Sequence, residues 1–181
     1  SKELFFDERL IIHEDSYFCN IVNFFANEKI NNDNAFYCWR KNPKSVSNQE
    51  YYFVKTMWRL LLTNNSLVNL MRTINVEKEK ISESVVDVVL QLYCEMQNNE
   101  WYLKEHKEYL DRTYGVLYWY IVNNIEYYNS ISEDSFKSIL SNVRTGHHYK
   151  TVEWFTIDQF IERIESYKAY AEKMGDPYIL N

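Results

Sequence analysis

Glycine and proline are scarce in this sequence of 181 residues, which contains three glycines and two prolines. All-β sandwiches and barrels need a turn about every 8–12 residues, and those turns use both residue types heavily. The scarcity therefore disfavours an all-β fold and favours long helices. Gly115, Gly146 and Gly175 also stand alone, so the sequence lacks the glycine-rich loops that hold phosphates in P-loop and Rossmann proteins.

Cysteine pairs at the spacing of a zinc or redox site are missing as well. The three cysteines, Cys19, Cys38 and Cys94, are far apart and odd in number, which predicts reduced thiols in a reducing compartment. Neither H-E-x-x-H nor E-x-x-H occurs around the four histidines, and helical metal sites depend on those spacings. We therefore expect no metal and no cofactor.

Long apolar runs are lacking too. The longest, Val116–Val122, is far shorter than the ~20 residues that a membrane-spanning helix requires. The first residues do not combine a basic stretch with a following apolar segment, as a signal peptide does. These observations predict a soluble cytoplasmic chain that does not engage a membrane.

Acidic side chains outnumber basic ones by 26 to 20, which gives a net charge of −6. Proteins that bind nucleic acid gain affinity from Lys and Arg side chains that neutralise phosphates, and most are basic. The acidic balance therefore argues against a nucleic-acid partner. It is compatible with a protein partner that is itself basic.

The apolar pattern predicts helices within one domain, residues 1–181. Apolar residues recur at spacings of three and four in six segments: 18–25, 54–62, 67–71, 85–96, 136–143 and 160–174. Capping boxes begin at Ser47, Ser130 and Thr156, each with Glu or Gln three residues later, and each precedes an apolar run. Gly175 and Pro177 are expected to end the last helix.

Residues 110–128 are predicted to form a buried central helix, because the second half of this stretch is apolar on nearly every side. The expected fold is accordingly a mainly all-α, single-domain bundle of several helices around that helix. Residues 147–155 alternate polar and apolar side chains and are a candidate strand, with residues 8–15 as its partner. Such a two-stranded β element would have to pack on the helices, because a lone hairpin is only marginally stable.

A cluster of basic and imidazole side chains surrounds Gly146, with Arg144 before it and His147 and His148 after it. Histidine can act as a general base, and arginine can stabilise a developing negative charge. This cluster supports one hypothesis of function, a helical ribonuclease-like enzyme. The competing interpretation is a polar loop whose imidazoles bond to nearby backbone groups.

Tyrosine is unusually abundant, with 16 residues, several of them in adjacent pairs. Neighbouring residues on a helix point in different directions, so we expect members of the pairs Tyr51–Tyr52 and Tyr127–Tyr128 to be exposed. Exposed tyrosines are typical of protein interfaces. The preferred hypothesis is therefore a non-enzymatic intracellular protein-binding module, of the kind formed by inhibitors, immunity proteins and antagonists, which occupies its partner's surface through these four tyrosines.

Overall fold

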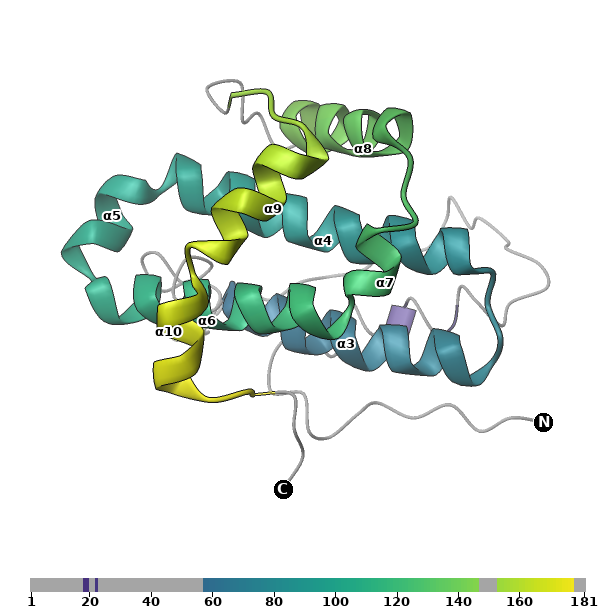
Figure 1. Ribbon diagram of the computed structural model, residues 1–181, viewed down its shortest axis with the longest axis horizontal. Coiled ribbons are helices and arrows are strands. Elements are labelled where there is room, and N and C mark those ends of the chain that lie inside the picture. Colours follow the sequence, from purple (N-terminus) through teal and green to yellow (C-terminus); the bar gives the residue numbers. More distant parts are fainter. Residues whose placement is uncertain (1–17, 20–21, 23–56, 147–152, 178–181) are drawn as a thin grey trace, which may run out of the picture.

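Helices form the regular secondary structure in the computed structural model, which describes residues 18–19, 22, 57–146 and 153–177. In these residues eight helices pack as one bundle and no strand is present (Figure 1). The all-α prediction is confirmed for this part of the chain. The helices are α3 (Trp58–Thr73), α4 (Lys78–Asn98), α5 (Glu100–Glu105), α6 (Lys107–Asn123), α7 (Ile125–Tyr128), α8 (Glu133–Gly146), α9 (Ile157–Glu165) and α10 (Lys168–Met174).

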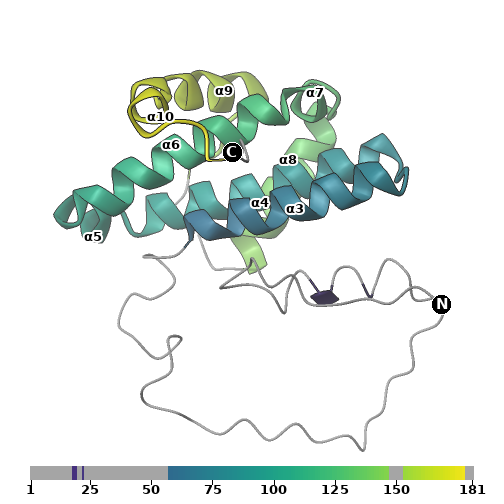
Figure 2. The ribbon, with the colours of Figure 1, turned by 90° about the horizontal axis from the view of Figure 1, so that it is seen from below.

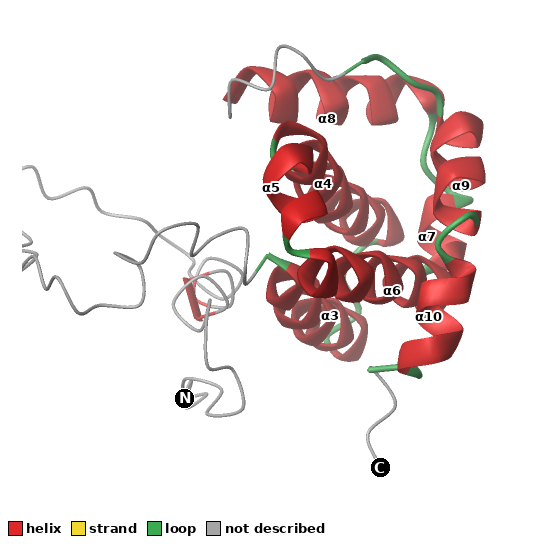
Figure 3. Ribbon diagram, turned by 90° about the vertical axis from the view of Figure 1, so that its left-hand side faces the viewer, coloured by secondary structure: helices red, strands yellow, loops and turns green. Residues whose placement is uncertain are grey.

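The core lies around α4 and α6. Helix α4 packs against α3, α7 and α8, whereas α6 packs against α3, α9 and α10. Figure 2 shows α6 between the α9–α10 pair and the α3–α4 pair, and Figure 3 shows α8 crossing the outer side of α4. Helix α4 buries apolar side chains along its whole length, from Ile81 to Met96. The interior is therefore shared between two helices.

The stretch predicted as one central helix, 110–128, is divided in two. Helix α6 buries Val116, Leu117, Tyr120 and Ile121 but ends at Asn123, and the single-turn helix α7 follows. Asn124, which separates them, is fully buried, and its side-chain amide donates a hydrogen bond of 2.8 Å to the Tyr120 carbonyl. This bond satisfies a carbonyl that the end of α6 leaves without a helical partner.

Helix α3 is continuous through Asn64 and Asn65, so the prediction of two separate helical segments, 54–62 and 67–71, is wrong. Asn64 accepts a hydrogen bond from the Tyr120 hydroxyl and donates one of 3.3 Å to Ser84 Oγ. Both partners lie on other helices, α6 and α4. The asparagine side chain is thus used to join three helices rather than to cap one.

Two of the three predicted capping boxes lie in the described residues and can be checked against the structure. The Thr156 box is confirmed: Gln159 N–H donates to Thr156 Oγ1 at 3.2 Å, and Thr156 N–H donates to Gln159 Oε1 at 2.9 Å. The Ser130 box is wrong, because Ser132 Oγ accepts the first-turn amide of Ser135 at 3.1 Å. The Ser47 box lies outside the described residues.

The predicted helix over 160–174 is two helices, because the chain turns at Ser166 and Tyr167 between α9 and α10. Gly175 ends α10 with φ of 79°, as expected for a residue free of a Cβ. Gly115 lets α6 approach α10: a Cβ built there would lie 3.3 Å from the Tyr170 carbonyl oxygen. The turn and the close approach together fold the C-terminal helices back onto α6.

The predicted β element falls almost wholly outside the described residues, which exclude 8–15 and 147–152. Residues 153–155 lie within the description and form no strand. Among the helices described, none combines the length and the apolar character needed to cross a membrane.

Candidate functional site

The most exposed large apolar side chain in the described residues lies where α8 meets the start of α9. Trp154 is 57% exposed, and the guanidinium carbon of Arg144 lies 4.3 Å from the centroid of its ring. Arg144 belongs to the last turn of α8, whereas Trp154 belongs to the short irregular segment before α9. We call this region, with the hollow described next, the α8–α9 corner.

A hollow of about 540 Å³ lies beside the Trp154 ring. Its floor is rigid, because Phe155 is buried against Tyr93 and Phe160 at centroid distances of 5.3 and 5.5 Å. An apolar floor that is fixed by the core is the usual setting for an anchor residue of a partner. The residues that line the hollow are Lys137, Ser138, Trp154, Phe155, Thr156 and Gln159.

Negative charge predominates on the α9 side of the corner. Residues 153–165 carry four carboxylates, Glu153, Asp158, Glu162 and Glu165, all of them exposed, and a single cation, Arg163. The Arg163 guanidinium donates a hydrogen bond of 2.6 Å to the Tyr93 hydroxyl and is thereby directed toward the core. The α8 side contributes two cations: Arg144, which packs on the Trp154 ring, and Lys137, which lies 3.6 Å from Glu133.

Arg144, a residue of the predicted catalytic cluster, lies in the corner. Its charge also acts on the buried thiol of Cys94, but burial is the larger influence and raises the pKa of Cys94 to about 12. Cys94 is therefore a neutral packing residue. His147 and His148 lie outside the described residues, so the catalytic grouping of Arg144 with these histidines stays a prediction.

Tyr127 and Tyr128 were expected to include an exposed ring, and that expectation is wrong, since they are only 5% and 2% exposed. Tyr127 lies beneath Arg72, whose Nε donates to its hydroxyl at 2.9 Å. Tyr128 stacks on Phe160 in the core at a centroid distance of 6.3 Å. The short helix α7 thus directs both rings inward. Tyr51 and Tyr52 lie outside the described residues.

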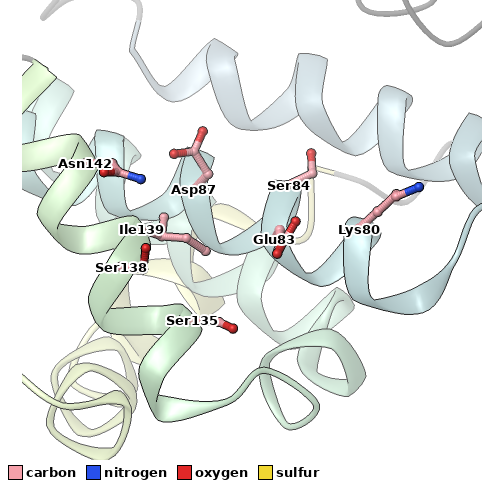
Figure 4. A pocket seen from close by; sticks show the side chains of 8 residues that line it. All are labelled: Lys80, Glu83, Ser84, Asp87, Ser135, Ser138, Ile139 and Asn142. Carbon is pink, nitrogen blue, oxygen red and sulfur yellow. The ribbon is translucent and has the colours of Figure 1, made fainter.

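A second hollow, polar and of about 490 Å³, runs between α4 and α8 (Figure 4). Glu83 and Asp87 lie one turn apart on α4, and Asp87 accepts a hydrogen bond of 2.7 Å from Gln91. Serine hydroxyls of α8 line the opposite wall, and neither histidine nor cysteine is among the residues that line the hollow. Lys80, the one lysine that lines this hollow, is exposed and lies 3.2 Å from Glu77.

No group of three His, Cys, Asp or Glu side chains arranged to hold a metal ion is found within 57–146 or the other described segments. Sequence reasoning did not identify Trp154, because it assigned this residue to a candidate strand. Comparisons with known proteins gave no match to a family model, to a curated protein or to a solved structure.

Proposed function

We propose that this chain is a non-enzymatic protein-binding module of the inhibitor, immunity-protein or antagonist type, and that the α8–α9 corner contacts its partner in the cytoplasm. The observation that carries the proposal is the placement of Trp154, which is 57% exposed, packs against the Arg144 guanidinium and lines a hollow with an aromatic floor. Tryptophan and arginine are enriched among residues that dominate binding energy.

The surface is also largely preorganised. Phe155 fixes the floor of the hollow, and the Thr156 capping box fixes the start of α9. Few side chains would need to be ordered when a partner binds, so less conformational entropy would be lost. The same rigidity would favour a partner that inserts one apolar anchor beside Trp154.

The partner we propose is a basic protein. The whole chain has a net charge of −6, and the α9 side of the corner carries four carboxylates against one cation that is bonded to the core. Complementary charge would raise the rate of association and exclude acidic competitors. An apolar anchor that fills the hollow, flanked by Lys or Arg side chains that face the carboxylates of residues 153–165, would match this surface.

The test compares two tryptophans of nearly equal exposure, Trp154 at 57% and Trp101 at 55%. Tagged wild type, Trp154→Ala and Trp101→Ala would be used to capture proteins under reducing conditions, and the affinity of the captured partner would then be measured with purified proteins. We expect Trp154→Ala to weaken binding about 30-fold, as at an interface hot spot, and Trp101→Ala to leave it unchanged.

Equal binding by wild type and Trp154→Ala would exclude the corner as the contact surface. Recovery of RNA, with cleavage that disappears in His147→Ala and His148→Ala, would replace the proposal with the ribonuclease hypothesis.

The charge of the partner is tested separately. Glu162→Lys on the acidic side of α9 should weaken binding and reduce its dependence on salt, because a favourable long-range attraction is lost. Glu105→Lys, an equal change of charge at an exposed position on α5, is the matched control. Tighter binding by Glu162→Lys would show that the partner is acidic at this surface.

A further inference from the structure

We infer that Arg144 is a positioning residue, which holds the Trp154 ring in the orientation that the partner recognises. The inference rests on the proposed function, since it assigns a role within the same corner. It also gives Arg144 a role different from the one that the ribonuclease hypothesis would give it, namely contact with a reacting phosphate.

The local backbone leaves the Trp154 ring in need of such a support. Trp154 lies in an irregular segment, so it lacks the neighbours one turn away that restrict a side chain on a helix. Phe155, the next residue, points into the core, whereas Trp154 points outward. A large exposed ring in this setting would exchange between rotamers unless another group packed on its face.

Arg144 supplies that packing from a more rigid element. It lies in the last turn of α8 and is half-buried, and α8 packs against α4. Its guanidinium lies 4.3 Å from the Trp154 centroid, closer than in the other cation–π contacts of the described residues, where the distances are 5.0–6.0 Å. A planar guanidinium can stack on the indole, which a lysine ammonium cannot do.

Arg144 and the hollow are separate neighbours of Trp154. Trp154 lines the hollow together with Lys137 and Ser138, and Arg144 does not line it. Arg144 lies about two turns farther along α8 than Lys137. Trp154 therefore contacts both Arg144 and the hollow, and we assign the two different tasks: Arg144 supports the ring, and the hollow receives the partner.

The experiment uses ¹⁹F NMR of the full chain labelled with 5-fluorotryptophan, whose five tryptophans give one resonance each. Trp154→Phe assigns the resonance of Trp154. We expect Arg144→Met to shift and broaden this resonance, and Arg144→Lys to restore it only in part. Arg59→Met is the matched control, because Arg59 lies 5.1 Å from the Trp58 ring and should affect that resonance alone.

Partner affinity is measured on the same variants, and their melting temperatures show that they are folded. We expect Arg144→Met to weaken binding about two- to fivefold, in keeping with an exposed cation–π contact. An unchanged Trp154 resonance in folded Arg144→Met would overturn the inference. If the resonance shifts but Trp154→Ala binds as wild type does, the proposed function has failed while the contact itself is real.

Discussion

Arginine packs on an aromatic ring both in the interior and at the α8–α9 corner, and the two settings differ in what covers the ring. At the edge of the interior, Arg72 lies over Tyr127 at 5.0 Å, donates to its hydroxyl and reaches Glu126 at 3.4 Å, while Tyr127 is 5% exposed. At the corner, Arg144 lies over a Trp154 ring that is 57% exposed. The same kind of contact between arginine and an aromatic ring joins helices at Tyr127 and leaves an exposed aromatic surface at Trp154.

A second arginine that packs on buried rings supports this contrast. Arg163 donates to the Tyr93 hydroxyl and lies over Phe155 at 5.5 Å, which connects α9 to α4 across 70 residues of sequence. Both of its rings are buried. Residue type alone therefore does not distinguish an aromatic that stabilises the fold from one that is available to a partner, and burial does.

The largest expected effect tests whether the corner is energetically separate from the interior. Leu117 is fully buried on α6, so Leu117→Ala should lower the free energy of unfolding by about 2–5 kcal/mol through lost burial and an added cavity. Trp154→Ala should lower it by less than about 1 kcal/mol, because most of that ring is already in water. Urea unfolding followed by circular dichroism measures both.

If Trp154→Ala lowered the free energy of unfolding as much as Leu117→Ala does, Trp154 would belong to the core and the corner would not be energetically separate from the interior. A small loss at Leu117 would mean that the interior is not centred between α4 and α6.

How much of this arrangement the sequence predicts depends on the range of the interactions. The Thr156 box was predicted because all of its atoms lie within four residues, and Gly175 ended α10 for a similarly local reason. Asn64 was misassigned because its partners, Ser84 and Tyr120, lie 20 and 56 residues away. Asparagine is common in turns, but Asn64 instead connects α3 to two other helices.

The candidate site was harder to predict for the same reason. Arg144 was identified as a functional candidate from its charge and its position near Gly146, but its stacking partner lies beyond residues 147–152. Tyrosine is common at interfaces, yet Arg72 and Phe160 cover Tyr127 and Tyr128 in the fold. Exposure is a property of the packed structure, and a local pattern contains little information about it.

An intermediate effect concerns two buried tyrosine hydroxyls. Tyr93→Phe should lower the free energy of unfolding by about 1 kcal/mol, because the bond to Arg163 is lost but the exposed guanidinium can regain water. Tyr128→Phe should have no cost or raise stability by about 1 kcal/mol, because the Tyr128 hydroxyl is buried without a hydrogen-bond partner in the described residues. Thermal unfolding of the two variants in parallel measures the difference.

A loss of stability in Tyr128→Phe equal to that in Tyr93→Phe would reveal a partner for the Tyr128 hydroxyl. In that case both buried tyrosine hydroxyls would be hydrogen-bonded, and the interior and the corner would differ only in how exposed their aromatic residues are.

The smallest expected effect is that of a reductant on the melting temperature, where we expect no change. Cys94 is fully buried and free, and because burial raises its pKa to about 12 the reactive thiolate is scarcely populated at neutral pH. Cys19 is free as well. Melting curves with and without dithiothreitol should therefore coincide, and they should do so for wild type and Trp154→Ala alike. A lower melting temperature in dithiothreitol would show that a disulfide stabilises the chain. Cys38→Ser would then test for a bridge between Cys19 and Cys38, because removal of that bridge would abolish the response of the melting temperature to reductant. Such a bridge would lie far in sequence from both the interior pairs and the corner.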